Sequence, residues 1–325
     1  MTETSQWQAE TREAVDGEGC PICGAALPTT PELCGRDLLF GVPGEFPVRE
    51  CRRCGAGVTY PLVPSHELGR YYPDEYVAYE VPSRALRLAL SGLYRLRDRR
   101  WLRSLPLSTL RSLRPGRALD VGCGRGDLGA LLIDQGWAVT GIEPSKEASE
   151  YAADRGLDVR NGVVETVELE PRNYDVAIFR HSLEHVVDPV ADLRRVHAAL
   201  APAGRVLITV PNFSSWQRSA FGSAWLALEL PRHRIHFGPR ALESALGRAG
   251  FELLSTATTT SLGVLPESVE RQLFGRSVFS HGVGQRLSLL AYAVLYPLGW
   301  VADRVAGDGD CLHVVARKRS QATAT

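Results

Sequence analysis

Short apolar runs alternate with segments of helical periodicity between residues 117 and 254. The runs are typical of buried strands, and the segments with apolar residues every three or four positions are typical of amphipathic helices. This alternation predicts a doubly wound α/β fold with a parallel sheet, whose ligands bind at the carboxyl ends of the strands. The expected strands are Ala118–Val121, Ala138–Glu143, Leu157–Arg160, Asp175–Phe179, Val206–Val210, Phe251–Thr256 and Leu312–Ala316.

The expected helices lie between these strands, and each is followed by a glycine. Glycine adopts the left-handed conformation that commonly ends a helix, so its position marks the end of each helical segment. The helices are Asp127–Gln135, Lys146–Arg155, Pro189–Leu200 and Pro239–Ala249, followed by Gly136, Gly156, Gly204 and Gly250.

The pattern divides the chain into four parts and a tail. Residues 1–19 are polar and are expected to be disordered, and residues 20–70 form a short module rich in glycine and proline. A helical linker follows over 71–113. The α/β domain covers 114–318, with a helical insertion over 257–305 before the last strand, and 319–325 form a frayed tail.

Charge and the N-terminal residues exclude some classes of partner. The 325-residue chain has 37 Lys and Arg residues and 37 Asp and Glu residues, so its formal net charge is zero. Such a balance gives no field that would gather nucleic acid, and we expect no nucleic-acid partner. The polar, acidic start does not resemble a secretory signal, so we expect a reducing, cytoplasmic location.

A glycine-rich turn follows the first strand of the α/β domain. Asp120 ends that strand, and Gly122, Gly124 and Gly126 let the backbone turn tightly against a ligand. Glu143 ends the second strand, where a carboxylate can accept hydrogen bonds from both hydroxyls of a ribose. A carboxylate at Asp120 would repel a pyrophosphate, so the turn favours S-adenosylmethionine (SAM) over NAD.

These segments resemble the class I SAM-dependent methyltransferases. The resemblance also covers Tyr174–Phe179, Leu183–Val186, Leu200–Ile208, Val210–Asn212 and Ala249–Phe251. It implies a Rossmann-like sheet of seven strands in the order 3-2-1-4-5-7-6, with Leu312–Ala316 as the antiparallel seventh strand. It implies that residues near Asn161–Val164 cover the adenine. The implied cofactor-binding residues are Asp120, Gly122, Cys123, Gly124, Gly126, Glu143, Pro144, Arg180 and His181.

Four cysteines form two C-x-x-C pairs in the N-terminal module. Cys20 and Cys23 are separated from Cys51 and Cys54 by 27 residues. Two such turns supply the four thiolates of a tetrahedral structural zinc site, and a segment this short needs a metal to fold. A redox role is the alternative. The module resembles the zinc ribbon of a bacterial methyltransferase group from glycan and natural-product pathways, so it shapes the substrate site or docks a partner.

Candidate catalytic residues follow the fourth and fifth strands. Methyl transfer to a hydroxyl needs a base, and histidine takes up a proton near neutral pH. His181 is the first candidate base and His233 the second, with Glu184 and His185 beside them in sequence or expected space. The alternative is structural, in which Glu184 and His185 cap a helix or brace the loop.

The same histidines suggest a second metal. Some ubiquinone-pathway and small-RNA methyltransferases have Glu-x-x-Glu-His and a later histidine, which bind a divalent metal beside the nucleophile. His181, Glu184, His185 and His233 resemble that set, except that His181 stands at the first glutamate. Such a metal would lower the pKa of an acceptor hydroxyl.

Two further segments bear on partners. Seven arginines between Arg84 and Arg103 predict either a helix that packs between modules or a cradle for an anionic or carrier-linked substrate. Leu287–Ala302 has 16 residues without charge but contains Pro297 and Gly299. A spanning helix needs about 20 residues, so we expect a buried or oligomer-facing helix, with peripheral membrane contact as the alternative.

The sequence therefore predicts a SAM-dependent methyltransferase that acts on a small-molecule or glycan acceptor, with a hydroxyl oxygen as the expected target. Three alternatives stay open at this point. They are methylation of carbon or nitrogen in a sugar or natural product, an NAD-dependent oxidoreductase, and a non-catalytic SAM-fold binding module.

Overall fold

The computed structural model describes residues 19–63, 65–72, 106–277 and 284–319, and omits the side chains of 65–66 and 284–293. Three expectations from the sequence lie largely outside these residues. They are the disordered start, the arginine-rich part of the helical linker and the C-terminal tail.

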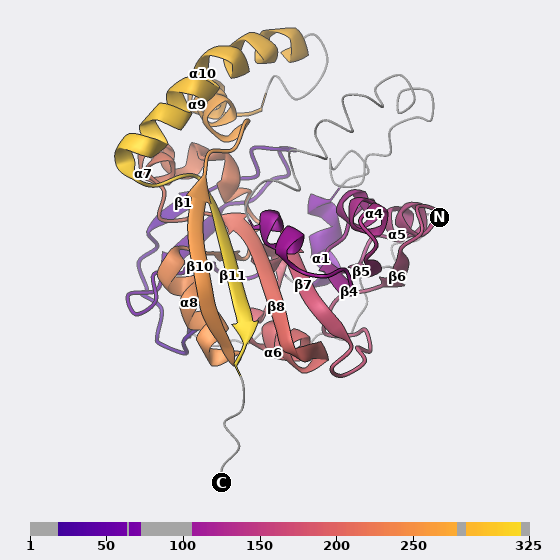
Figure 1. Cartoon of the computed structure of the whole chain (residues 1–325). Helices are drawn as coiled ribbons and strands as arrows, with labels where there is room; N and C mark the ends of the chain where they lie inside the picture. Colours follow the sequence, from indigo (N-terminus) through magenta and orange to yellow (C-terminus); the bar gives the residue numbers. More distant parts are fainter. Residues whose placement is uncertain (1–18, 64, 73–105, 278–283, 320–325) are drawn as a thin grey trace, which may run out of the picture.

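A seven-stranded sheet forms the centre of the molecule (Figure 1). Its order is β10-β11-β8-β7-β4-β5-β6, in which only β11 runs antiparallel to its neighbours. Numbered from β4 as the first strand of the domain, this is 3-2-1-4-5-7-6, which confirms the expected fold. The strands are β4 (Arg117–Val121), β5 (Ala138–Glu143), β6 (Asp158–Asn161), β7 (Tyr174–Arg180), β8 (Leu200–Pro211), β10 (Phe251–Thr259) and β11 (Cys311–Lys318).

Helices cover both faces of this sheet and differ from expectation only at their ends. The expected helix over Pro189–Leu200 stops at Ala199, because Leu200 already pairs with Tyr174 as the first residue of β8. The helices of the domain core are α4 (Asp127–Asp134), α5 (Lys146–Ala153), α6 (Pro189–Ala199) and α8 (Pro239–Arg248), with the 3-10 helix η2 (Leu107–Ser112) before β4.

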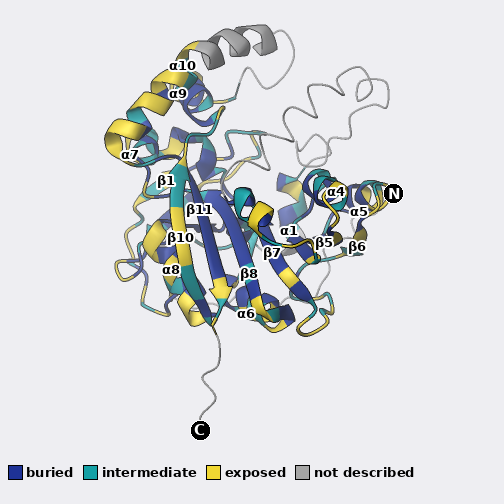
Figure 2. Ribbon diagram, viewed as in Figure 1, coloured by how far each residue is buried: buried dark blue, intermediate teal, exposed yellow. Residues whose placement is uncertain are grey.

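Alternating side chains along the strands build two hydrophobic cores. In β7, Ala177 and Phe179 join the core that contains α6 and α8, whereas Val176 and Ile178 join the core that contains α4 and η2. Successive strand residues point to opposite faces, so a continuous apolar run fills both. In Figure 2 the central strands are mostly buried, with exposed residues near their ends.

The N-terminal module forms a second, antiparallel sheet, and this sheet contains a strand from the distant part of the chain. Its order is β1 (Leu33–Gly35), β2 (Phe46–Glu50), β3 (Gly57–Thr59) and β9 (Ile235–His236). Gly57 pairs with His236, and Val58 pairs with Ile235. A two-residue strand has no recognisable alternation, so β9 could not be predicted from the sequence.

The remaining helices surround the end of the sheet where β8 and β10 finish. They are α1 (Ser65–Leu68), α7 (Trp216–Phe221), α9 (Val264–Phe274) and α10 (Gly284–Ala306), with 3-10 helices η1 (Gly69–Tyr71), η3 (Leu183–His185), η4 (Gly222–Ala224) and η5 (Leu226–Leu228). Figure 1 shows α9 and α10 beyond that end of the sheet.

The long helix α10 carries exposed apolar side chains. Val294, Leu298, Val301 and Val305 are exposed and recur at intervals of four, three and four residues, which places them along one side of the helix. Pro297 lies inside the helix, as the sequence indicated. Among the residues that the structure describes, no helix has the length and hydrophobicity needed to cross a membrane.

A buried ion pair joins the N-terminal module to the α/β domain. Arg232 donates to Asp37 at 2.7 Å, and both side chains have no exposed surface. Arg232 also donates to Glu229 at 3.0 Å and to the carbonyl of Tyr71 at 2.9 Å. A buried charge that loses its partner is costly, so these contacts hold the two parts in one arrangement.

We expect Asp37→Asn to lower the free energy of unfolding by about 3 kcal/mol, because it leaves the buried Arg232 guanidinium without its closest counter-charge. Denaturant unfolding measures the change. The control is Arg36→Ala, which breaks the exposed Arg36–Glu45 pair at 2.7 Å and should cost less than about 1 kcal/mol. An equal loss of unfolding free energy in the two variants would contradict the stabilising role of the buried ion pair.

Candidate functional site

The turn after β4 depends on its glycines. Gly122, Gly124 and Gly126 have φ values of 72°, 53° and 69°, a region that favours glycine. A Cβ on Gly122 would lie 2.6 Å from the Cβ of Ser182, so the turn also packs closely against the end of β7. The result is a loop whose backbone lies open to a ligand at the carboxyl end of β4.

Two carboxylates flank this turn. Glu143 accepts hydrogen bonds from the backbone N–H groups of Gly124 at 2.8 Å and Ser145 at 2.9 Å. Burial raises the pKa of Glu143 to about 7 and the pKa of Asp120 to about 6. Oδ2 of Asp120 is buried and has no hydrogen-bond partner among the described residues, so it can accept one from a ligand.

A cavity of about 440 Å³ opens beside the turn. Five of the expected cofactor-binding residues line it, namely Gly122, Cys123, Gly124, Arg180 and His181. Gly126, Asp120, Glu143 and Pro144 are not among the lining residues, and the carbonyl of Pro144 accepts a hydrogen bond from Asn161 at 3.1 Å. The structure therefore places part of the turn against one cavity, and Glu143 contacts the turn through the backbone N–H of Gly124.

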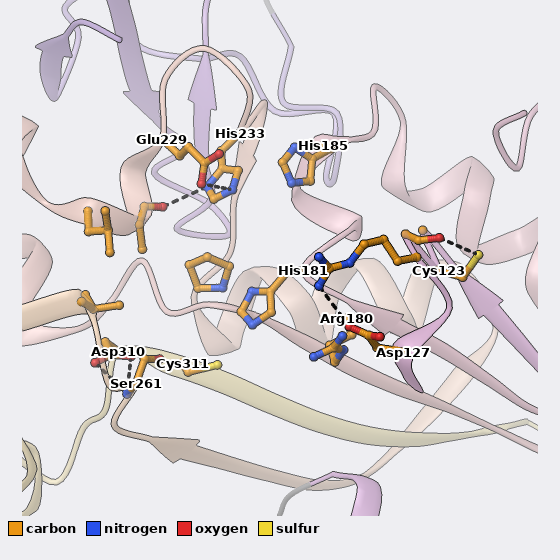
Figure 3. A pocket seen from close by; sticks show the side chains of 17 residues that line it. Cys123, Asp127, Arg180, His181, His185, Glu229, His233, Ser261, Asp310 and Cys311 are labelled. Carbon is orange, nitrogen blue, oxygen red and sulfur yellow. Dashed lines mark hydrogen bonds and ion pairs between the residues drawn. The ribbon is translucent and has the colours of Figure 1, made fainter. Parts of the chain in front are cut away.

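Figure 3 shows the opposite sides of the cavity. Glu229, His233 and His185 lie together on one side, Cys123, Asp127 and Arg180 on another, and Ser261, Asp310 and Cys311 on a third. Neither Glu229 nor Asp310 was expected at this site from the sequence. Each precedes or follows an irregular segment, and no periodicity or motif marked it.

His181 lies between these groups of residues in the cavity (Figure 3). Its φ is 54°, which is uncommon for a residue with a side chain, and its N–H donates to the carbonyl of Thr209 at 2.8 Å. Although desolvation opposes its charge, the neighbouring Cys311 and the Glu184 carboxylate, whose Oε1 lies 3.6 Å from Nδ1 of His181, raise the pKa of His181 to about 10. The imidazole is therefore protonated at neutral pH and is a better hydrogen-bond donor than base.

Glu184, His185 and His233 bring possible ligand atoms within 4.8 Å of one another. Glu184 is buried, and neither of its oxygens accepts a hydrogen bond from the described residues. The nearest basic atoms to its Oε1 are Nδ1 of His181 at 3.6 Å and Nε2 of His233 at 4.0 Å. Such a carboxylate is expected to have a partner, because a buried charge without one is unfavourable.

Backbone carbonyls orient the two histidines of this cluster. Nδ1 of His233 donates to the carbonyl of Ala227 at 2.9 Å, and Nδ1 of His185 lies 3.1 Å from the carbonyl of Arg232. In each ring the Nε2 lone pair is left for another partner, which is the arrangement of metal-binding histidines. Burial and the neighbouring His233 lower the pKa of His185 to about 4, so it is neutral at pH 7.

The four cysteines of the N-terminal module come together as predicted. Cys20 Sγ lies 3.6 Å from Cys54 Sγ, Cys23 Sγ lies 3.5 Å from Cys51 Sγ, and all four sulfurs lie within 4.8 Å of one another. Sulfurs at a zinc–sulfur distance of about 2.3 Å in a tetrahedron are about 3.8 Å apart. The buried cluster therefore fits zinc, while Cys34 is exposed and lies outside it.

Comparisons with known proteins identify the family. The model of a methyltransferase domain matches residues 93–256. A ubiquinone biosynthesis O-methyltransferase of Azorhizobium caulinodans is 31% identical over 161 residues, which are 46% of this chain and 64% of that protein. The protein of the same name from Yersinia pestis is 33% identical over 126 residues, 36% of this chain and 52% of that protein. The chain thus matches about half to two thirds of these relatives' length.

Solved structures of similar proteins include two methyltransferases. One is a putative sarcosine dimethylglycine methyltransferase from Galdieria sulphuraria, with a TM-score of 0.48, 19% identity, and coverage of 69% of this chain and 86% of that one. The other is a SAM-dependent methyltransferase from Thermotoga maritima, with a TM-score of 0.44, 20% identity, and coverage of 64% and 84%.

The family model covers half of the chain, including the glycine turn and strands β4 to β8. The strand order of the sheet agrees with it. This chain belongs to the class I SAM-dependent methyltransferase family.

Proposed function

We propose that the protein transfers the methyl group of SAM to a hydroxyl oxygen of a small-molecule or glycan acceptor. The observation that carries this proposal is the cluster of Glu184, His185 and His233, whose two histidines line the same cavity as the glycine turn. The relatives named as O-methyltransferases support oxygen as the target. The seven free cysteines support a reducing compartment, and we propose the cytoplasm.

The cofactor end of the cavity is the glycine turn with its two carboxylates. We assign the ribose of SAM to Glu143 and the positively charged methionyl end to Asp120, whose Oδ2 has no partner among the described residues. Arg180 and Cys123 line the cavity between the turn and His181. Because backbone N–H groups already fix Glu143, its carboxylate is oriented before the ligand arrives.

The acceptor end is the side of Glu229, His185 and His233 (Figure 3). Glu184, His185 and His233 fit a divalent cation, because they offer two imidazole nitrogens and a carboxylate whose oxygens accept no hydrogen bond from the described residues. A cation bound there would lower the pKa of an acceptor hydroxyl and orient its oxygen. His181, protonated at neutral pH, can donate a hydrogen bond to the acceptor, and His233 is the better candidate base where no cation binds.

The proposal is tested by supplying SAM with a carbon-13 methyl group to the purified protein in the presence of Mg²⁺. The acceptor probes are a panel of phenols and vicinal diols, compared with primary amines. The chemical shift of the transferred carbon reports whether it is bound to oxygen, nitrogen or carbon. Turnover confined to amines or to carbon acids would overturn the choice of oxygen.

We expect the affinity for S-adenosylhomocysteine (SAH) to rise as pH increases from 6 to 8. The ribose hydroxyls donate to Glu143, so binding favours its ionised form, and the raised pKa of about 7 puts that ionisation inside this range. Calorimetry at several pH values measures the effect. In Glu143→Gln the affinity at pH 8 should fall by about tenfold or more and lose this pH dependence, whereas Glu150→Gln on the exposed face of α5 should match the wild type.

We expect one zinc ion per chain in the four-cysteine cluster, measured by elemental analysis after growth in zinc-supplemented medium. Cys51→Ser should remove this zinc and lower the unfolding temperature, because the thiolates supply much of the energy that folds so short a segment. Cys34→Ser, at the exposed cysteine between the pairs, should change neither quantity. Full zinc content in Cys51→Ser would rule out the cluster as the binding site.

The cation at the acceptor end is tested with Mn²⁺, which prefers oxygen and nitrogen ligands to thiolates. Glu184→Gln should weaken Mn²⁺ binding by more than tenfold, measured from the electron paramagnetic resonance signal of free Mn²⁺. Asp192→Asn is the matched control, because Asp192 is also a buried carboxyl whose Oδ1 has no partner among the described residues. A chelator titration that leaves methylation unchanged in zinc-replete enzyme would exclude a catalytic cation.

The chemical class of the acceptor rests on fewer observations. The arginine-rich segment that predicts an anionic or carrier-linked substrate lies outside the described residues. Leu226, Ala227 and Val264 add apolar side chains to the lining of the cavity, and Glu229 adds a carboxylate. We therefore propose an acceptor with an apolar body and hydroxyl groups.

A further inference from the structure

The loop that carries Glu229 and His233 contacts the four-cysteine module through strand pairing and through hydrophobic packing. Residues 213–237 connect β8 to α8, and within them β9 pairs with β3 of the module. Phe213, Trp225 and Leu230 share a hydrophobic cluster with Phe46 and Val48 of β2. The loop that lines the acceptor end of the cavity is thus held by a module far away in sequence, although none of the module's described residues lines the cavity itself.

Thr59, the last residue of β3, makes polar contacts with both His233 and His236. Its hydroxyl donates to the carbonyl of His233 at 2.7 Å and accepts from Nε2 of His236 at 3.1 Å. Its backbone N–H donates to the carbonyl of Arg234 at 3.0 Å. Thr59 is buried, so water does not substitute for these bonds. One residue therefore fixes the backbone on both sides of Arg234.

The contacts of Thr59 determine where the imidazole of His233 lies. The backbone N–H of His233 donates to the carbonyl of Glu229 at 3.1 Å, and its Nδ1 donates to the carbonyl of Ala227. These bonds hold the residue from one side, and the Thr59 hydroxyl holds it from the other. With the backbone fixed in this way, Nε2 of His233 faces Glu229 at 3.6 Å and Glu184 at 4.0 Å.

The paired cysteines fix Thr59 in turn. Cys51 and Cys54 lie in the turn that joins β2 to β3, and the N–H of Cys51 donates to the carbonyl of Ala56 at 2.8 Å. Tyr72, which follows the module, adds a second connection, since its hydroxyl lies 3.0 Å from Nδ1 of His185. Both histidines of the acceptor end are therefore in contact with residues N-terminal to the α/β domain.

We propose that Thr59 is a positioning residue of the acceptor site, and that the four-cysteine module supports the loop that carries His233 and thereby orients this histidine. This inference rests on the proposed function, because it concerns the acceptor end of the same cavity. It assigns the module a role separate from SAM binding, since none of these contacts reaches the glycine turn. A purely structural role of Thr59 would instead affect both ends of the cavity to the same extent.

The test compares Thr59→Val, which has the same shape but no hydroxyl, with Thr59→Ser, which keeps the hydroxyl. Mn²⁺ binding to zinc-loaded protein reports on the acceptor end, and calorimetry with SAH reports on the cofactor end. We expect Thr59→Val to weaken Mn²⁺ binding by about tenfold and to leave the SAH dissociation constant within about twofold. Thr59→Ser should retain both affinities. Thr140→Val, at a buried strand threonine that contacts Asp158, is the control for general loss of stability.

Three results would overturn the inference. They are unchanged Mn²⁺ binding in Thr59→Val, a proportional loss of Mn²⁺ and SAH binding, and a Thr59→Ser variant that behaves like Thr59→Val. If Thr59→Val does not fold, Thr59→Ala takes its place, because the smaller side chain leaves room for water beside His236 while still losing the bond to His233.

A second measurement separates this inference from the proposed cation. In protein labelled with nitrogen-15 at histidine, the imidazole spectrum shows which ring nitrogen carries the proton, and no metal is needed. We expect His233 to be protonated at Nδ1 in the wild type and to shift towards the Nε2-protonated form in Thr59→Val. His313, held by Thr209 and Thr259, is the internal reference. If the wild type binds no Mn²⁺ but Thr59→Val still shows this tautomer shift, the proposed cation is excluded and the positioning role is retained. If the His233 tautomer is the same in Thr59→Val as in the wild type, the positioning role itself is overturned.

Discussion

The hydrogen bonds between β3 and β9 are the interaction on which the acceptor side of this molecule depends. A strand of two residues is too short to be stable alone. It forms here because Gly57 and Val58 of β3 pair with it. Gly57 also leaves room for Phe213, whose ring would lie only 2.7 Å from a Cβ added at Gly57. Through this pairing, the module and the loop after β8 form a single sheet, and this sheet holds the backbone of His233.

The two ends of the cavity are built on different physical principles. At the cofactor end, backbone N–H groups and glycines form the surface, and the carboxylates of Asp120 and Glu143 are held behind it in a poorly solvated setting that raises their pKa values. At the acceptor end, side chains form the surface, and the histidine rings are oriented by backbone carbonyls. The first end is formed by a turn of the seven-stranded sheet, and the second is formed by a loop that contacts the module. The residues of the two ends therefore come from different parts of the structure.

Most of the fold could be predicted because each strand, helix and turn has a recognisable pattern in the local sequence. The continuous apolar run within β7 indicated a strand buried on both faces, and the glycines at the turn indicated both a tight bend and a ligand surface. The four cysteines were recognisable by spacing alone. The contributions of Thr59 and Arg232 could not be predicted, because they depend on contacts with His233 and Asp37 across 174 and 195 residues of chain. Glu229 contacts nearby residues, but it follows a short 3-10 helix that has no recognisable sequence pattern. A polar residue in a loop carries no local sign of such a partner, and the partner of β3 was a strand too short to have a period.

The sequence separation of 174 residues between Thr59 and His233 also has a consequence for how the protein forms during synthesis. The module leaves the ribosome first, and its β3 edge has open N–H and C=O groups until residues 235–236 have been made. Unpaired edges are the part of a nascent sheet most prone to join another chain. The short length of β3, which has three residues, limits that exposure until the strand that completes the sheet has been made.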